Sequence, residues 1–295
     1  MAHELPSMEA RGQPEIRMTT RAFTLLYHDV VPEGRWESSG FEGADADVYK
    51  LDCADFRRHL AAIAQSLRHP PTTGPALLAR PSTEHPVLIT FDDGGVSAAL
   101  YIADMLEERA WKGHFFVTGC RIGTSGFLDR NQIRDLHQRG HIIGSHSYSH
   151  PLRMAHCSAE QLDDEWRRSA LVLTDILGEP IQVASVPGGD YSRQVAVAAS
   201  RAGIKLLFNS EPVTRTQIVE DCLVLGRITV KRGHQPKRSS AIAAGNRQLQ
   251  IRAYLFWSAK KVAKQLLGRM WLRVRVILLE HRAKKDARPG ADSRN

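Results

Sequence analysis

The sequence has few cysteines, and no apolar run is long enough to cross a bilayer. Its four cysteines, Cys53, Cys120, Cys157 and Cys222, lie far apart in 295 residues, and no two form a Cys-x-x-Cys pair. This spacing argues against a disulfide framework or a zinc ribbon. The first twenty residues carry acids and prolines and lack the apolar segment of a signal peptide. We therefore expect reduced thiols and a cytoplasmic protein.

Charge is distributed unevenly along the chain. Residues 1–230 carry 23 Lys and Arg against 29 Asp and Glu, whereas residues 231–295 carry 17 against 3. Such an asymmetry suggests an appendage with its own role. We predict a flexible N-terminus over 1–20, one domain over 21–230, and a basic linker with an amphipathic C-terminal helix over 231–295.

Strand-like and helix-like segments alternate along the body. The apolar runs are 23–28, 87–91, 114–119, 141–145, 181–186, 205–210 and 223–230, and the helical patterns are 52–66, 96–109, 129–139, 158–177 and 192–202. Strict alternation predicts a parallel sheet or barrel. Residues that follow successive strands should then meet at one mouth.

Polar side chains follow these strands. In LITFDDGG, Asp92 and Asp93 directly follow the apolar residues of the strand. HSYSH places His146 and His150 four residues apart. Two histidines and a carboxylate are a common set of ligands for a divalent metal, which would also offset the repulsion between the adjacent acids. One aspartate can bind the cation, and the other is free to take a proton from water. The spacing of the histidines alone can arise by chance, but together with the paired acids it favours a metal site.

TFDDG at 90–94 and HSYSH at 146–150 resemble motifs of the polysaccharide deacetylase family, whose catalytic unit is the NodB homology domain of carbohydrate esterase family 4. The resemblance spans about residues 20 to 230. It implies a distorted (β/α) barrel that removes acetyl groups from sugars with a divalent metal, typically Zn²⁺. By motif position, Asp92 is the general base, and Asp93, His146 and His150 are the metal ligands.

Two departures from the family pattern stand out. Many members have an arginine that orients the base two residues before the proline of their third motif, and ASVPGGDY has Ser185 there. In that loop, Pro187, Gly188 and Gly189 are the candidates for oxyanion and substrate contact. The usual histidine motif near the end of the domain is also missing. LLYHDV at 25–30 resembles it, displaced to the front, so we expect a circularly permuted member with His28 as the general acid.

The predicted function is removal of acetyl groups, with N-acetyl favoured, from a polysaccharide or glycan precursor. One alternative is an amidohydrolase of the same fold that acts on a small non-sugar amide. Another is a catalytically silent glycan-binding or scaffold protein, which the missing arginine would suit. Residues 249–282 combine helical apolar spacing with many Lys and Arg. They predict either a helix packed on the barrel or peripheral contact with the inner face of a membrane or with a membrane-bound glycan assembly. We expect no nucleic-acid partner, because the body is acidic.

Overall fold

The computed structural model describes residues 21–79 and 85–267. The flexible N-terminus predicted over 1–20, and the part of the predicted C-terminal helix beyond residue 267, lie outside the described residues. The boundary expected at residue 230 stays a prediction.

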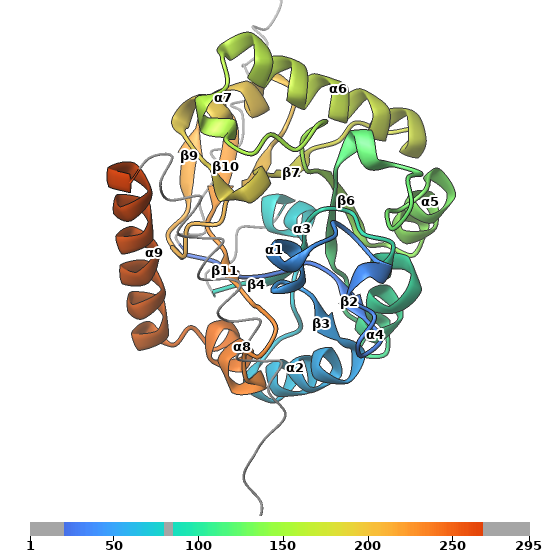
Figure 1. Ribbon diagram of the computed structural model, residues 1–295, viewed down its shortest axis with the longest axis vertical. Coiled ribbons are helices and arrows are strands. Elements are labelled where there is room, and N and C mark those ends of the chain that lie inside the picture. The colour runs from blue at the N-terminus through green and yellow to red at the C-terminus, as the bar shows by residue number, and fades with distance from the viewer. Residues whose placement is uncertain (1–20, 80–84, 268–295) are drawn as a thin grey trace, which may run out of the picture.

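A nine-stranded, curled sheet forms the centre of the molecule (Figure 1). All neighbouring strands pair in parallel except β9 and β10, which are antiparallel. The alternating pattern predicts such a parallel sheet, and the curled shape agrees with the distorted barrel that the family resemblance implies. In spatial order the strands are β11 (Ile228–Thr229), β1 (Phe23–Tyr27), β4 (Val87–Phe91), β5 (His114–Val117), β6 (Ile142–Ser145), β7 (Val183–Ser185), β8 (Leu206–Phe208), β10 (Cys222–Leu225) and β9 (Gln217–Val219).

The predicted strand 223–230 is two strands separated by a bend at Gly226 and Arg227. Its first half, β10, pairs with β8, and its second half, β11, pairs with β1. One continuous segment therefore bridges the two sides of the curled sheet. The bend needs glycine, because a Cβ atom at position 226 would lie 2.4 Å from the carbonyl oxygens of Glu211 and Val213.

Helices surround the sheet (Figure 1). Several begin where the sequence places a capping side chain: Asp52 accepts from Asp55 N–H, and Asp129 and Ser158 form capping boxes with Gln132 and Gln161. The predicted helix 96–109 is instead a π-helical turn followed by a short α-helix. The outer helical elements are α2 (Cys53–Ser66), η2 (Ala98–Ile102), α4 (Ala103–Glu107), α5 (Arg130–Gln138), α6 (Ala159–Leu177), α7 (Arg193–Arg201) and α8 (Pro236–Ala243).

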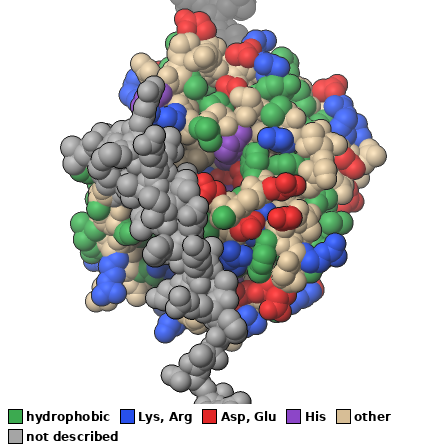
Figure 2. All heavy atoms as spheres, viewed as in Figure 1, with side chains coloured by type: hydrophobic (Ala, Val, Ile, Leu, Met, Phe, Trp, Pro, Cys, Tyr) green, Lys and Arg blue, Asp and Glu red, His purple; other side chains and the backbone are tan. Residues whose placement is uncertain are grey.

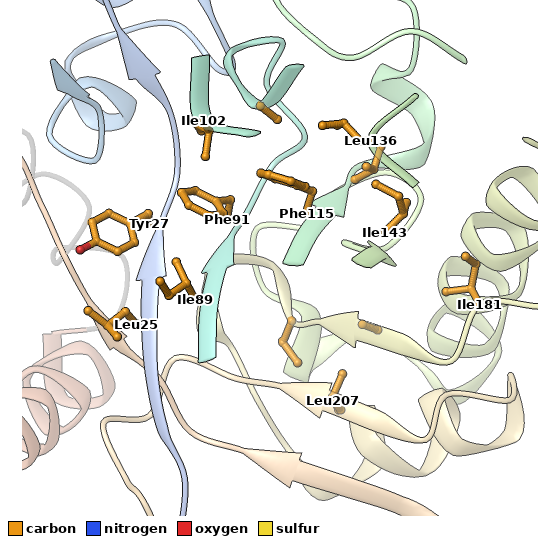
Figure 3. Close-up of a cluster of buried hydrophobic side chains, with 14 of the residues drawn as sticks. Leu25, Tyr27, Ile89, Phe91, Ile102, Phe115, Leu136, Ile143, Ile181 and Leu207 are labelled. Carbon is orange, nitrogen blue, oxygen red and sulfur yellow. The ribbon is translucent and has the colours of Figure 1, made fainter. Parts of the chain in front are cut away.

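Alternate residues of each strand fill two separate cores. Ile89 and Phe91 belong to the main core, where Phe91 stacks between Tyr27 and Phe115 (Figure 3). A second cluster lies on the other face of the sheet. It holds the intervening strand residues, such as Leu88, together with Leu77 of the short helix α3 (Gly74–Ala79). Neither α3 nor β9 was predicted from the sequence.

The segment 32–47, which follows the first predicted strand, carries short elements. These are η1 (Trp36–Ser38) and α1 (Ala44–Asp47), with a two-stranded sheet of β2 (Val30–Val31) and β3 (Leu51–Asp52) on either side. Asp29 anchors the segment, because its Oδ1 atom accepts hydrogen bonds from Ser39 (2.6 Å) and Ser97 (2.7 Å). The remaining single turns are η3 (Gly119–Arg121), η4 (Met154–His156) and η5 (Pro187–Gly189).

The last described helix, α9 (Arg247–Leu267), runs along the outer edge of the molecule next to α8 (Figure 1). Several of its apolar side chains are exposed, Ile251, Leu255 and Val262 among them. In the described part of the chain, no helix combines the length and the apolar character needed to span a bilayer.

Candidate metal and catalytic site

Three side chains from two strand-end loops converge on one point. Asp93 follows β4, and His146 and His150 follow β6. Asp93 Oδ1 lies 3.4 Å from His146 Nε2 and 3.5 Å from His150 Nε2, and the three candidate ligand atoms all lie within 4.8 Å of one another. The sequence-predicted ligands are thus brought together. Histidine and acidic side chains meet in a hollow of the face shown in Figure 2.

The backbone around these ligands is held in unusual conformations. Asp93 and His150 have φ values of 76° and 59°, which non-glycine residues rarely adopt. Glu165 of α6 holds the second loop in place by accepting the backbone N–H groups of Tyr148 (2.9 Å) and Ser149 (2.8 Å). Backbone strain of this kind persists only where surrounding contacts enforce it, and it is frequent at functional sites.

Hydrogen bonding prepares His146 to act as a ligand through Nε2. Its Nδ1 atom lies 2.5 Å from Ser185 Oγ and 3.2 Å from the Ser185 carbonyl oxygen. Because a carbonyl can only accept, the hydrogen is on Nδ1 and the Nε2 lone pair points toward Asp93. Burial by itself would raise the pKa of Asp93, but its close contacts with the His146 and His150 rings outweigh it and hold that pKa well below its ordinary value. Two imidazoles and an ionised carboxylate are donors that fit a divalent metal such as zinc.

Asp92 is buried and paired with Arg227. The guanidinium donates two hydrogen bonds of 2.7 Å, from Nη1 to Oδ1 and from Nη2 to Oδ2. Burial opposes ionisation of Asp92, but the charge of Arg227 more than compensates and lowers its pKa. Asp92 Oδ2 also lies 3.9 Å from His146 Nε2. A carboxylate that stays ionised beside the ligand cluster can accept a proton.

Arg227 is the functional residue that the sequence analysis missed. Ser185 leaves no arginine in the third motif, but the guanidinium reaches Asp92 from the bend between β10 and β11. The missing arginine of the third motif therefore no longer supports a catalytically silent protein. A signal was present in the sequence, since LVLGRITV places a charged residue inside an apolar strand, and a buried charge requires a partner.

His28 lies at the end of β1 beside the same site. Burial lowers its pKa, although the nearby charge of Asp93 acts in the opposite direction. Its ring contacts that of Tyr49, with centroids 4.7 Å apart. Within the described residues, His28 Nδ1 is buried and has no hydrogen-bond partner. The role of His28 as general acid stays a prediction, and so does circular permutation.

The third-motif loop follows Ser185 directly. Its residues Pro187–Gly189 form the turn η5, in which Gly188 and Gly189 have φ values of 58° and 64°. The Gly189 N–H donates to the Val186 carbonyl oxygen (3.1 Å), so Gly188 is the better candidate for a free main-chain donor. At position 189 a side chain would also collide with Ser210, 2.5 Å from the Cβ position.

Comparison with known proteins agrees with this geometry. Residues 79–207 match the family model described as "Polysaccharide deacetylase". Residues 79–207, less than half of the chain, are therefore similar to a polysaccharide deacetylase domain. The chain is 29% identical over 130 residues to the putative polysaccharide deacetylase YxkH of Bacillus subtilis, covering 44% of this chain and 46% of that protein. It is also 29% identical over 127 residues to the peptidoglycan-N-acetylmuramic acid deacetylase PdaA of the same organism, covering 42% and 46%.

Solved structures show the same fold. IcaB from Ammonifex degensii superposes with a TM-score of 0.62 at 20% identity, over 77% of this chain and 98% of that one. The chain spans about half the length of the curated relatives it matches. The NodB-type barrel expected from two short motifs is therefore confirmed, and residues 79–207 match the family model that the same motifs predicted.

Proposed function

We propose that this polysaccharide deacetylase domain hydrolyses N-acetyl groups on a glycan or glycan precursor, with a divalent metal, most simply Zn²⁺, as cofactor. The observation that carries the proposal is the position of Asp92, an ionised and buried carboxylate whose Oδ2 atom lies 3.9 Å from the first metal-ligand histidine. The names of relatives that act on acetylated peptidoglycan sugars support the substrate class.

Each residue of the site has a separate role in the proposed reaction. Asp93, His146 and His150 would hold the cation, which supplies a Lewis acid that activates water and polarises a carbonyl. Asp92 accepts the proton of the attacking water. The Gly188 N–H would donate to the oxygen that becomes negative, and His28 would protonate the departing nitrogen.

Acetate release tests the proposal. We expect purified protein to release acetate from short chito-oligosaccharides or lipid-linked N-acetyl sugars, and chelation to stop the release. Asp92→Asn should lower kcat by roughly 10²–10⁴-fold while the metal stays bound, since it removes the base and none of the ligands. Asp104→Asn, at an exposed position of α4, is the matched control and should leave kcat unchanged.

The same assay separates the alternatives. A substrate panel should include O-acetylated sugars and small non-sugar acetamides. Turnover confined to small amides would replace the glycan proposal by the amidohydrolase of the same fold. A protein that binds glycan and metal without releasing acetate from any substrate would be a silent binding protein.

We propose a second property for α9: peripheral contact with an anionic membrane surface. Ile251, Leu255 and Val262 recur at helical spacing, and they are exposed to 59%, 61% and 52%. The sequence of α9 contains five Lys and Arg and no Asp or Glu. Like charges disfavour pairing of this helix with a second copy, whereas an anionic lipid surface complements both its charge and its apolar face.

Vesicle flotation tests the membrane contact. The protein should float with vesicles that contain phosphatidylglycerol and not with phosphatidylcholine alone. The double variant Ile251→Ser/Leu255→Ser should lose binding, and Leu171→Ser, which removes an exposed leucine of α6, should not. Equal binding to neutral vesicles, or a dimer in solution that the double variant abolishes, would contradict the proposal.

A further inference from the structure

We propose that Arg227 and Ser185 are positioning residues that orient Asp92, so that Oδ2 is the oxygen that accepts the proton. The inference rests on the proposed function, because it assigns atoms within the same site. Arg227 lies outside the third motif, and Ser185 stands within it where many members of the family have an arginine.

The two oxygens of Asp92 have different surroundings. Oδ1 accepts hydrogen bonds from Arg227 Nη1 (2.7 Å) and from Ser185 Oγ (3.0 Å). In the described part of the chain, Oδ2 accepts only from Arg227 Nη2 (2.7 Å). A carboxylate oxygen can accept two hydrogen bonds, so Oδ1 is saturated and Oδ2 keeps one free position. Oδ2 is also the oxygen recorded 3.9 Å from His146 Nε2.

Arg227 can fix the carboxylate because it is itself fixed. Its Nε atom donates to the Asn209 carbonyl oxygen (2.9 Å), and Nη1 also reaches Thr90 Oγ1 (3.3 Å). The guanidinium carbon lies 5.7 Å and 5.8 Å from the ring centroids of Phe116 and Phe208. A planar fork held in this way sets the plane of the carboxylate, which a lysine cannot do.

Ser185 connects the base to a metal ligand. Its hydroxyl donates to Asp92 Oδ1, and Ser185 Oγ in turn accepts the Nδ1–H of His146 at 2.5 Å. The single hydroxyl hydrogen points toward Asp92, so Ser185 can only accept from His146. One side chain therefore keeps Oδ1 occupied and keeps the Nε2 lone pair of His146 directed toward Asp93.

Arg227→Lys tests the fork, because it keeps the charge and removes the paired geometry. We expect kcat for acetate release to fall about 100-fold with KM and zinc content per chain unchanged. Arg139→Lys is the matched control: it alters another arginine held by several carboxylates, at the end of α5, and should leave all three quantities unchanged. A folded Arg227→Lys protein with kcat within about threefold of wild type overturns the inference.

A double-mutant cycle shows whether Arg227 acts through Asp92. In an Asp92→Asn background, Arg227→Lys should cause no further loss of the residual rate, since the group it orients is gone. An equal loss in both backgrounds would mean that Arg227 acts elsewhere and would overturn the inference. Wild-type protein that releases no acetate would refute the proposed function instead.

Ser185 variants supply a test that remains valid if Arg227→Lys does not fold. Ser185→Ala removes both hydrogen bonds and should lower kcat and weaken zinc affinity by about 10–100-fold, measured by chelator competition. Ser185→Thr keeps the hydroxyl and should retain both properties. Unchanged kcat and zinc affinity in Ser185→Ala would overturn the inference.

Discussion

At the scale of single residues, the candidate base and the candidate acid of the site differ in how firmly they are held. Asp92 is fixed by Arg227 and Ser185, whereas His28 Nδ1 has no hydrogen-bond partner among the described residues. Within that part of the chain, no hydrogen bond therefore fixes the orientation of the His28 ring through Nδ1. This difference suits a proton donor that acts late in the reaction.

The leaving group tests His28 directly. His28→Gln should lower kcat on an acetamide by about 10²-fold, because an amine leaves only after protonation. An activated aryl acetate ester, whose leaving group departs as an anion, should be hydrolysed at nearly the wild-type rate. Asp92→Asn serves as the comparison and should slow both substrates. Equal losses on the amide and the ester in His28→Gln would assign the acid to another residue.

The sequence predicts site residues well when each of them lies in a short motif. Asp93, His146 and His150 were expected as a cluster because each lies in a short motif that follows an apolar strand, and the structure brings them within ligand distance. Arg227 could not be placed in the same way. Its contact with Asp92 spans 135 residues of sequence, and it depends on a bend that moves one side chain inward where β10 gives way to β11.

At the scale of secondary-structure elements, α8 is attached to α2 through a buried polar chain. Tyr27 Oη donates to Ser239 Oγ (3.0 Å), and Ser239 Oγ lies 2.8 Å from His59 Nδ1. His59 Nε2 lies 2.9 Å from the His234 carbonyl oxygen, which only accepts, so His59 Nδ1 must accept from Ser239. Ser239 therefore satisfies two buried groups at once.

Removing this hydroxyl should destabilise the fold. Ser239→Ala leaves Tyr27 Oη and His59 Nδ1 with only their long mutual contact of 3.5 Å, and we expect the free energy of unfolding to fall by about 1–3 kcal/mol. The adjacent Ser240, whose hydroxyl donates to the Lys237 carbonyl oxygen near the surface, is the matched control. Ser240→Ala should change stability by less than about 0.5 kcal/mol. Urea unfolding measures both, and equal effects would show that the buried chain contributes nothing specific.

The inner helix α3 is joined to the sheet by a histidine that must remain neutral. His114 Nδ1 lies 3.0 Å from the Ile89 carbonyl oxygen, and its Nε2 atom accepts the Gly74 N–H (2.8 Å). Burial lowers the pKa of His114 to about 4. Both nitrogens have partners only in the neutral form, so a second proton would face the Gly74 N–H.

This arrangement predicts an acid-dependent loss of stability. Unfolded histidine titrates near pH 6.5, so between pH 6.5 and about 4 the unfolded chain binds more protons than the folded one. The free energy of unfolding should therefore decrease as pH falls through this window, by up to about 1.4 kcal/mol per pH unit from this group. His114→Leu should be less stable at pH 7 but lose less on acidification. Parallel stability curves from urea titrations would contradict the assignment.

Element boundaries were predictable where capping residues mark them. The 158–177 helix begins and ends within one residue of its expected limits, because Ser158 and Gln161 form the capping box and Gly178 takes a left-handed conformation at the other end. The short elements α3, β2 and β3 have no such marks. Their positions depend on tertiary contacts, such as those of Gly74 with His114 and of Ser39 with Asp29, which a single sequence does not show.

At the scale of the whole molecule, the site draws on parts of the chain that are far apart in sequence. The candidate ligands come from the ends of β4 and β6, the guanidinium that fixes the base comes from the segment joining both sides of the sheet, and His28 comes from β1. A cation held by Asp93, His146 and His150 would bind the folded chain and not the unfolded one. Metal binding should therefore increase the free energy of unfolding of the entire barrel.

Removal of the metal should lower the melting temperature. At a free zinc concentration one hundred times the dissociation constant, the stabilisation is about 2.7 kcal/mol, which corresponds to several degrees for a domain of this size. Asp93→Asn should abolish the difference between zinc-loaded and chelator-treated protein. Asparagine is the suitable replacement because it tolerates the φ of 76° at this position, which alanine does not.

The control for this experiment is Asp104→Asn, which should keep the full zinc-dependent shift. An equal shift in Asp93→Asn and wild type would place the cation elsewhere on the protein. A melting temperature that does not respond to zinc in the wild type would mean that the three donors, although close together, hold no ion. In that case Asp92, ionised beside the ligand cluster, would have no activated water from which to take a proton.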